Sequence, residues 1–452
     1  MAKHPLSLTE DRIRTALPRF ALPFLLANVL QSLYGAVDLV IIGRYCSSAA
    51  ISAVATGTQL MMTLLGLIIG LSTGNTVLLG QSIGEKNGEK GGHAVGTAAT
   101  LFLILAVIVT PLIIIFALPM LRLMQIPAEA EVHAHNYLTI CACGIPFILG
   151  YNCIGGCFRA MGDSKTPMIF VAVSSCVNLL GDLLLVGALH MNAAGAALAT
   201  VFSQMTSFVM SLIVLMKKGF PFPFHRHYFK PDWKAMGFIL KVGVPLSAQE
   251  ALVNVSFLLI TAMVNGMGVT ASASVGIVEK ILGFVMMPPM AFSAAVTTIT
   301  AQNIGAKQPE RALQGLRWGI LYALIFGVAF CAAAVIVPQF FTGIFSKDPA
   351  VVQMAASYLR PYSTDCILIC VIFTMNSYFN GCGKSLISFV HSMVATFGVR
   401  VPLCRFVLPY CVGTLTPMGL CMPAASVVSL IICGGYFLWL RKKMKAQTEL
   451  AE

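Results

Sequence analysis

Two short motifs each occur twice in the chain, at one spacing of 221 residues. QSIGEKNGEK at 81–90 returns as QNIGAKQPER at 302–311, and FRAMGDS at 158–164 returns as FNGCGKS at 379–385. Two separate matches at the same offset indicate a duplicated unit with almost no insertions or deletions between its copies. The chain must therefore fold as two successive copies of one architecture.

The duplicated unit has the composition of a membrane protein. Hydrophobic residues make up 58% of the chain and charged residues only 10%, against roughly a quarter charged in soluble domains. Twelve apolar stretches are each long enough to cross a hydrocarbon core, which is about 30 Å thick. We expect helices, because lipid offers the backbone no hydrogen-bond partner and the strands of a barrel would be shorter and alternating. The expected spans are 17–42, 51–79, 94–118, 132–157, 167–189, 193–216, 237–265, 271–300, 316–338, 351–380, 386–411 and 418–440.

We therefore predict an all-α integral membrane protein whose twelve transmembrane helices form two pseudo-symmetric six-helix lobes around a central cavity. Parallel halves of this kind are a transporter architecture. The N-lobe is expected at 1–216 and the C-lobe at 237–452. Between them, residues 217–236 contain three prolines, so we expect an extended cytoplasmic linker whose aromatic side chains lie along the membrane surface.

The net charge of +12 follows the membrane topology. With the N-terminus inside, most of the 29 Lys and Arg residues fall on the same side of the membrane. This distribution is the positive-inside rule and places both termini in the cytoplasm, with the chain in the plasma (inner) membrane. It excludes a nucleic-acid surface as the reason for the charge. The first twenty residues carry Glu10 and Asp11 and run straight into a span, so no cleavable signal peptide is expected.

Helix ends and helix breaks are also visible in the sequence. The recurring Gly84 and Gly305 are expected at the ends of helices. Pro23, Pro288 and Pro289 lie inside expected spans, where each removes a backbone hydrogen bond. We interpret these prolines as hinges, with a purely structural kink as the alternative.

Ionisable residues inside spans are the sharpest functional signal, because each is costly in hydrocarbon and by default marks a pathway. The first half has two, Asp38 and Asp182. Asn178 precedes Asp182 by four residues and shares its helix face, and Thr200 adds a hydroxyl in a span rich in glycine and alanine. If their helices converge, these side chains could hold a proton or a sodium ion. The alternative is a hydrogen-bonded network that only joins helices.

The second half carries its own charged residues. Glu250 and Asp365 lie in separate spans, and Glu279 and Lys280 are adjacent in a third. Arg360 and Arg400 could neutralise some of these acids. A structural pair and a functional site are equally compatible with the sequence.

Nucleotide and metal sites are not indicated. GCGKS at 381–385 resembles the end of a phosphate-binding loop, but that motif needs a glycine at 378, where Tyr378 stands. Active transport must therefore draw on an ion gradient. The fourteen cysteines include no CxxC pair and no metal spacing, so we expect no cofactor, and no metal other than Na⁺ at Asp38, Asn178, Asp182 and Thr200.

Over residues 15–440 the chain resembles the MATE (multidrug and toxic compound extrusion) family of the MOP flippase superfamily. VDLVIIG around Asp38 resembles the family's first-span aspartate motif, and Asn178-x-x-x-Asp182 resembles its fifth-span motif. Thr200 falls where the family has a threonine, and FRAMGDS at 158–164 matches its R-x-x-G-D signature.

The resemblance implies a secondary antiporter with a V-shaped central cavity, exporting amphipathic, often cationic drugs or metabolites in exchange for H⁺ or Na⁺. Asp38, Asn178, Asp182 and Thr200 would form its N-lobe coupling site. A C-lobe cation site would use Glu250 and Asp365, with Gln249 as a further family-matching polar residue. Here the sequence departs from the pattern, because Asp365 lies further before the following loop and Asn380 replaces the Arg159 type. The protein is expected to act as a monomer, without nucleic-acid or nucleotide partners, on a small amphipathic molecule.

Two other functions compete with an ion-coupled exporter. A flippase of lipid or lipid-linked sugar precursors shares the lobed architecture, but such proteins tend to have fourteen spans and basic cavities. A non-transporting scaffold or receptor would not need intramembrane acids. No enzymatic activity is indicated.

Overall fold

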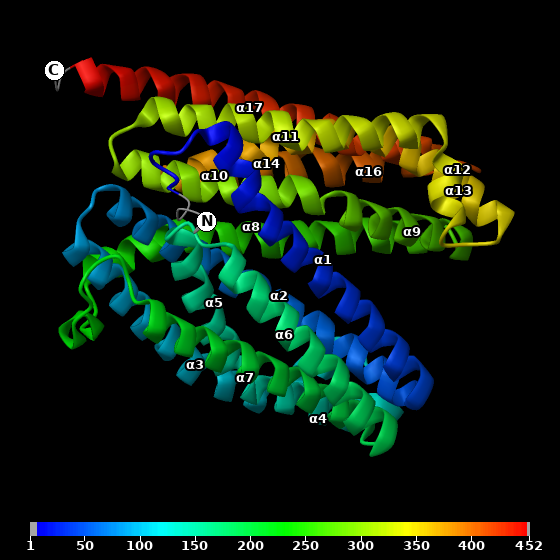
Figure 1. Ribbon diagram of the computed structural model, residues 1–452. Helices are drawn as coiled ribbons and strands as arrows, with labels where there is room; N and C mark the ends of the chain where they lie inside the picture. The colour runs from blue at the N-terminus through cyan, green and yellow to red at the C-terminus, as the bar shows by residue number, and fades with distance from the viewer. Residues whose placement is uncertain (1–6, 450–452) are drawn as a thin grey trace. The chain divides into compact units, whose positions relative to one another are not determined.

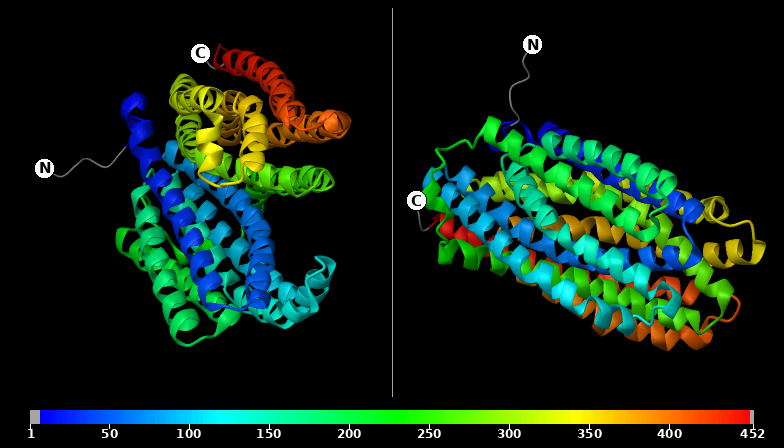
Figure 2. Two further views of the ribbon diagram at one scale, coloured as in Figure 1. Left: turned by 90° about the vertical axis from the view of Figure 1, so that its right-hand side faces the viewer. Right: turned by 90° about the horizontal axis from the view of Figure 1, so that it is seen from below.

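A computed structural model describes residues 7–449, which contain helices and no strand. The chain divides into two compact units, shown with their helices labelled in Figure 1. Unit 1 holds Leu22–Ser247, and unit 2 holds Leu8–Ala21 together with residues 248–449. Within each unit the long helices run side by side (Figures 1 and 2).

The helices that begin in the first half are α1 (Ile13–Tyr45), α2 (Ser48–Gly84), α3 (Gly88–Leu123), α4 (Ala128–Cys143), α5 (Ile145–Ala160), α6 (Lys165–Asp182), the π-helical η1 (Leu183–Ala188), α7 (Asn192–Lys218) and the short 3-10 helix η2 (Arg226–Phe229). The second half contains α8 (Trp233–Asn265), α9 (Val269–Val285), α10 (Met287–Gly305), α11 (Pro309–Ile336), α12 (Pro338–Gly343), α13 (Pro349–Tyr362), α14 (Asp365–Gly381), α15 (Ser385–Met393), the π-helical η3 (Val394–Arg400), α16 (Val401–Val407), η4 (Leu408–Tyr410) and α17 (Thr416–Glu449).

The expected membrane-helical fold is confirmed, with a refinement of the span count. Within residues 7–449, nine helices are long and apolar enough to cross a membrane. Two bent pairs, α4 with α5 at 43° and α9 with α10 at 44°, raise that number to as many as eleven. The remaining expected span, 351–380, consists of α13 and α14, which have 14 and 17 residues and are separated by Ser363 and Thr364. Breaks within three of the expected spans account for the difference between twelve expected spans and nine continuous long helices. A hydropathy window averages over such a break and does not detect it.

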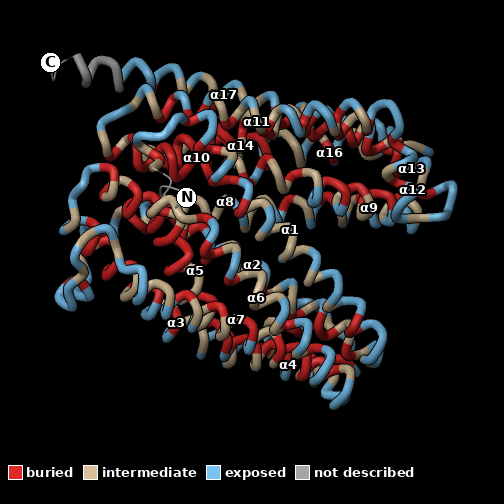
Figure 3. The backbone as a smooth tube through the Cα atoms, viewed as in Figure 1, coloured by how far each residue is buried: buried red, intermediate tan, exposed pale blue. Residues whose placement is uncertain are grey.

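The exterior of both units is apolar, as lipid requires. Val107 and Ile115 on α3 are 67% and 70% exposed, and exposed segments follow the outer edges of the helices in Figure 3. Buried residues gather where α2 packs on α3, α4 and α5, and where α10 packs on α11 and α14. Small residues permit the closest approaches, since a Cβ added at Gly181 of α6 would lie 2.9 Å from Cβ of Ala199 on α7.

The duplication extends to the backbone. Lys86 and Lys307 are left-handed residues with φ of 54° and 57°, and Gly162 and Gly383 have φ of 81° and 71°. Each follows the end of a helix, and each turn has the same pair of reversed backbone hydrogen bonds, which is the Schellman arrangement. Gly84 and Gly305 are the last residues of α2 and α10, so the expectation that they end helices is confirmed.

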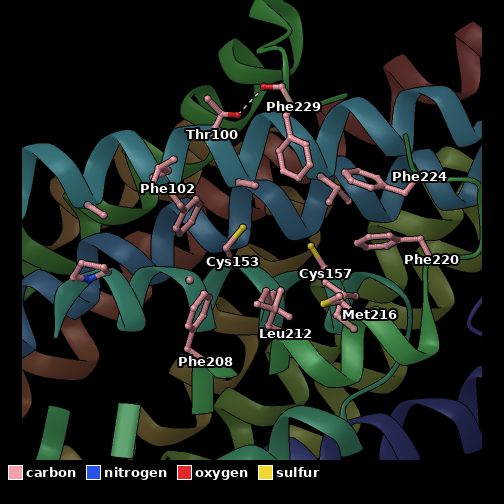
Figure 4. Close-up of a pocket in the computed structure, with 18 of the residues that line it drawn as sticks. Thr100, Phe102, Cys153, Cys157, Phe208, Leu212, Met216, Phe220, Phe224 and Phe229 are labelled. Atoms are coloured by element: carbon pink, nitrogen blue, oxygen red, sulfur yellow. Dashed lines mark hydrogen bonds between the residues drawn. The ribbon is translucent and has the colours of Figure 1, made fainter. Parts of the chain in front are cut away.

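The linker between the halves contains no continuous helix between the end of α7 at Lys218 and the start of α8 at Trp233. It contains η2, and its aromatic side chains pack on one face of α3 where glycines leave room. A Cβ added at Gly91 would lie 2.7 Å from the Phe222 ring, and one at Gly92 would lie 2.5 Å from the Tyr228 ring. The Thr100 hydroxyl donates a 2.9 Å hydrogen bond to the carbonyl of Phe229 (Figure 4).

Two long helices are divided between the units, each beside a proline. The division of α1 falls between Ala21 and Leu22, next to Pro23, and that of α8 falls between Ser247 and Ala248, close to Pro245. In unit 2, Asn303 and Arg311 donate hydrogen bonds to the backbone carbonyls of Leu8 and Asp11, just before α1. Tyr322 donates to the carbonyl of Arg14, in the first turn of α1.

Candidate functional site

The two intramembrane acids of the first half meet inside unit 1. Asp38 comes from α1, and Asp182 is the last residue of α6. Their carboxyl groups lie within hydrogen-bonding reach of each other. Asp182 is fully buried, and neither its two oxygens nor Oδ1 of Asp38 receives a hydrogen bond from any other described residue. Two acceptors thus face each other with no donor between them.

The local helix geometry places Asp182 at this point. The α-helix α6 ends at Asp182 and continues as the π-helical η1. Such widened turns are rare and occur frequently at functional sites. The close approach of Gly181 to Ala199 fixes α6 against α7 at the same level.

The amide of the predicted site, Asn178, lies on α6 together with Asp182, and the hydroxyl, Thr200, lies on the neighbouring helix α7. Asn178 is 2% exposed, one helical turn before Asp182, and its Nδ2 has no acceptor among the described residues. Thr200 follows Ala199, the residue that contacts Gly181, and its hydroxyl donates to the carbonyl of Ala196 at 3.0 Å. The Thr200 oxygen keeps its lone pairs and can still accept a hydrogen bond or contact a cation.

A tyrosine that sequence analysis missed belongs to the same neighbourhood. Tyr34 of α1 hydrogen-bonds Gln31 and lies within electrostatic reach of both Asp38 and Asp182. It precedes Asp38 by four residues, so it occupies the same helix face. That spacing could have identified it.

Of the polar and charged residues predicted in the second half, some line one pocket and others lie outside it. Gln249 and Glu250 of α8 and Glu279 of α9 line a pocket of about 480 Å³ in unit 2. Asp365 is fully buried at the start of α14 and is not among the residues that line the pocket, although it lies near Arg400. Lys280 is exposed and also lies outside the lining.

The same pocket contains two basic side chains. Arg400, in η3, forms no ion pair within the described part of the chain, and its Nε has no acceptor there. Its guanidinium carbon lies 5.5 Å from the centroid of the Phe257 ring. His391, which sequence analysis missed, bonds Asn376 Oδ1 through Nε2 at 2.6 Å and Ser429 Oγ through Nδ1 at 2.7 Å.

Two of the three predicted hinge prolines lie at a break. Pro288 and Pro289 are in the first turn of α10, where the chain bends by 44° after α9. Prolines fit a first helical turn because their missing N–H groups would have no partner there. Pro23 lies within α1, which is helical on both sides of it.

The acid pair has the donor set of a site for one small cation. In the described residues no group of three or more His, Cys, Asp or Glu side chains is arranged to hold a metal ion. An alkali cation at Asp38 and Asp182 would complete its oxygen shell with Asn178, Thr200, backbone carbonyls or water. A proton shared by the two carboxyl groups would satisfy the same geometry.

Comparison with known proteins gives a consistent result. The MatE family model matches residues 23–184 and 245–406, two segments at almost the same spacing as the repeated motifs. The probable multidrug resistance protein YoeA of Bacillus subtilis (strain 168) is 30% identical over 434 residues, 94% of each chain. YpnP of the same strain, also named a probable multidrug resistance protein, is 28% identical over 395 residues, covering 87% of this chain and 88% of its own.

Solved structures share the fold. One, described as the outward-facing conformation of a multidrug resistance MATE family transporter of the MOP superfamily, matches with a TM-score of 0.90 at 20% identity. The match covers 99% of this chain and 100% of that chain. Because the family model matches both halves and the similarity to YoeA runs along nearly the whole length, the chain belongs to the MatE family and is a multi-pass membrane transporter rather than an enzyme.

Proposed function

We propose that this protein is a secondary active antiporter that exports amphipathic, cationic drugs or metabolites in exchange for H⁺ or Na⁺, and that Asp38 and Asp182 form its coupling site. The observation that carries the proposal is the facing pair of carboxyl groups in unit 1, with no donor from another residue to Asp182 or to Oδ1 of Asp38. The names of the relatives, which call them multidrug resistance and multidrug export proteins, support the cargo class.

Electrostatics makes such a pair a switch. Two carboxylates in contact within a low-dielectric interior cannot both stay charged without compensation. A proton or a sodium ion bound between the two carboxyl groups compensates their charge. When that ion leaves, two like charges remain and repel each other. The pair therefore stabilises the close approach of α1 and α6 only while a proton or a sodium ion is bound between the two carboxyl groups.

The pair is connected to the rest of the chain through α1. This helix carries Asp38 in unit 1, while its first turns belong to unit 2, and Pro23 lies beside the change. A change in the separation of the two carboxyl groups must be taken up along α1, and the proline, which lacks one backbone hydrogen bond, is the weakest point for bending. Ion occupancy would thus bias the conformation of α1 and, through it, the affinity for cargo.

The test is cargo efflux from proteoliposomes with a pH gradient and a sodium gradient imposed separately. Tetraphenylphosphonium serves as the amphipathic cationic probe. One gradient is expected to drive efflux in the wild type, and Asp38→Asn and Asp182→Asn are expected to abolish that dependence. Asp348→Asn is the matched control, because Asp348 is an exposed helix cap in unit 2. Gradient-driven efflux at the wild-type rate in both amide variants would refute the coupling role.

A further inference from the structure

Unit 1 contains a second feature that ion coupling does not use, an apolar groove between α3, α5 and α7 (Figure 4). Its volume is about 760 Å³, within the range of ligand sites. Phe102, Cys153 and Leu212 are typical of its wall, and Thr100 carries its single side-chain hydroxyl. That hydroxyl already donates to the carbonyl of Phe229. The groove can therefore accept only an apolar group without burying an unsatisfied polar one.

The groove lies in one half of the bundle's length. On α3, which begins at Gly88, and on α7, which ends at Lys218, its lining is the portion nearest the linker. On α5 it covers most of the helix, which is the second member of the bent pair α4–α5. At 1.5 Å per residue the lined stretches extend about 12–16 Å, close to half of a hydrocarbon core of about 30 Å. The lined stretches are 95–106 on α3, 146–157 on α5 and 208–216 on α7, and Gly219 adds to the lining just after α7 ends.

The end of the groove is formed by aromatic side chains of the linker. Rings of Phe220 and Phe224 have centroids 5.4 Å apart, and those of Phe224 and Phe229 are 5.5 Å apart in a T-shaped contact. In Figure 4 these three rings gather at one end of the groove. The linker is held on α3 by the packing of Phe222 and Tyr228 against glycines. The end is thus preformed, and its aromatic rings suit the membrane–water interface.

Three basic residues lie close in sequence to the residues that form this end. Lys217 and Lys230 each directly follow a lining residue, and Arg226 lies two residues after Phe224. All three are exposed, and none forms an ion pair within the described residues. Lys218 differs, because it is paired with Asp163 at 2.8 Å. The one acidic residue of the linker, Asp232, accepts a hydrogen bond from the backbone of Lys234. Clusters of Lys and Arg at the cytoplasmic surface attract anionic lipids.

We propose that this groove binds an anionic glycerophospholipid of the inner leaflet. One acyl chain occupies the space between α3, α5 and α7, and Lys217, Arg226 and Lys230 hold the phosphate. The length of the groove is close to the thickness of the hydrocarbon region of one leaflet, and its apolar wall favours a hydrocarbon chain. A cationic cargo is a poor occupant, because the wall contains no carboxylate and three basic residues lie close in sequence to its end.

Native mass spectrometry of the full chain in detergent tests the proposal, with phosphatidylglycerol and phosphatidylcholine of identical acyl chains as probes. The wild type is expected to bind phosphatidylglycerol about fivefold to tenfold more tightly. The triple variant Lys217→Gln, Arg226→Gln, Lys230→Gln is expected to bind both lipids equally. Because it changes only exposed side chains, it should fold normally.

A second set of variants tests the groove itself. Ala99→Trp and Leu212→Trp each place an indole in the groove from a different helix, and either is expected to reduce the binding of both lipids at least fivefold. Ile115→Trp is the control, because Ile115 is an exposed residue of α3 outside the groove. Thermal unfolding in detergent identifies which variants are folded.

Three results would overturn the proposal. One is a phosphatidylglycerol preference that persists in the triple variant, and another is lipid binding unaffected by both tryptophans. The third is binding of tetraphenylphosphonium that the groove tryptophans abolish while lipid binding is unchanged, which would make the groove a cargo site. None of these results depends on whether Asp38 and Asp182 couple ions.

Discussion

The two halves of this chain share a backbone plan and differ in the chemistry placed on it. Their left-handed helix ends recur at Lys86 and Lys307 and at Gly162 and Gly383. At the same 221-residue offset, however, the counterparts of Asp38 and Asp182 are Leu259 and Leu403. The facing acids of unit 1 thus have no equivalent in unit 2.

Unit 2 has instead a pocket in which charges of both signs are exposed to one space. Glu250, Glu279 and Arg400 line it, and no ion pair joins them within the described residues. Duplication has therefore preserved the elements that determine the fold while the polar residues diverged. We infer that ion coupling belongs to the first half and that the second half has another role, such as contact with cargo.

The largest expected effect tests this division of roles. Asp182→Asn should reduce gradient-driven efflux at least tenfold, because an amide neither releases a proton nor repels Asp38. Glu250→Gln and Glu279→Gln should leave the dependence on the gradient intact, whatever they do to cargo affinity. The measurement is efflux from proteoliposomes as a function of the imposed gradient. Loss of coupling in the glutamine variants with its retention in Asp182→Asn would reverse the assignment of the halves.

The next effect concerns a contact that the first half alone makes. A Cβ at Gly96 of α3 would overlap the backbone carbonyl group of Tyr228 in the linker. Gly96→Ala should therefore destabilise the protein by about 1–3 kcal/mol through forced overpacking, measured as thermal unfolding in detergent. Gly276→Ala on α9 is the control, since nothing lies within 4 Å of its added Cβ. Equal stability of the two variants would mean that the linker is not anchored on α3.

Arg400 offers a smaller effect in the second half. Arg400→Gln removes a positive charge from a pocket that keeps Glu250 and Glu279, so a cationic molecule in the pocket should bind more tightly. We expect about a fivefold gain in affinity for tetraphenylphosphonium, which corresponds to roughly 1 kcal/mol, measured by calorimetry. Arg405→Gln, an exposed arginine five residues further on, should change nothing. An unchanged affinity in Arg400→Gln would exclude the pocket from contact with that cargo.

Sequence reasoning succeeded where the signal is local and failed where it depends on packing. Hydropathy located the spans, and the four-residue spacing placed Asn178 and Asp182 on one face. The breaks at Gly144 and at Ser363–Thr364 were missed because apolar residues continue on both sides of them. His391 carries no local signal, since its partners Asn376 and Ser429 come from other helices.

The linker illustrates the same limit. Its aromatic residues were expected to lie along the membrane, but part of the surface they contact is the glycine face of α3, more than a hundred residues earlier in the chain. Nothing in residues 217–236 identifies that partner. Gly88, Gly91, Gly92 and Gly96 form that face, and their sequence does not indicate which segment packs on them.

The smallest expected effect compares Asp163 with its repeat counterpart, Lys384. In the loop between α5 and α6, Asp163 accepts hydrogen bonds from Lys218 at 2.8 Å and from the Thr166 hydroxyl at 2.6 Å. Burial on its own would raise the pKa of Asp163, but the bonds from Lys218 and Thr166 outweigh it and hold the pKa below the ordinary value of 3.8. The carboxylate is therefore favoured in the folded protein.

A lowered pKa fixes the sign of the pH dependence. The stabilisation is complete above the unfolded value near 3.8 and is lost as the pH falls through the lower folded value. Asp163→Asn should cost about 0.2–1 kcal/mol at neutral pH, because the pair is partly exposed. The cost should shrink at high ionic strength and vanish at the acid end of the accessible range. Lys384→Gln removes an exposed lysine at the equivalent turn and should leave thermal unfolding unchanged. A loss of stability in Lys384→Gln as large as that in Asp163→Asn would mean that the two turns are stabilised alike despite their opposite charges.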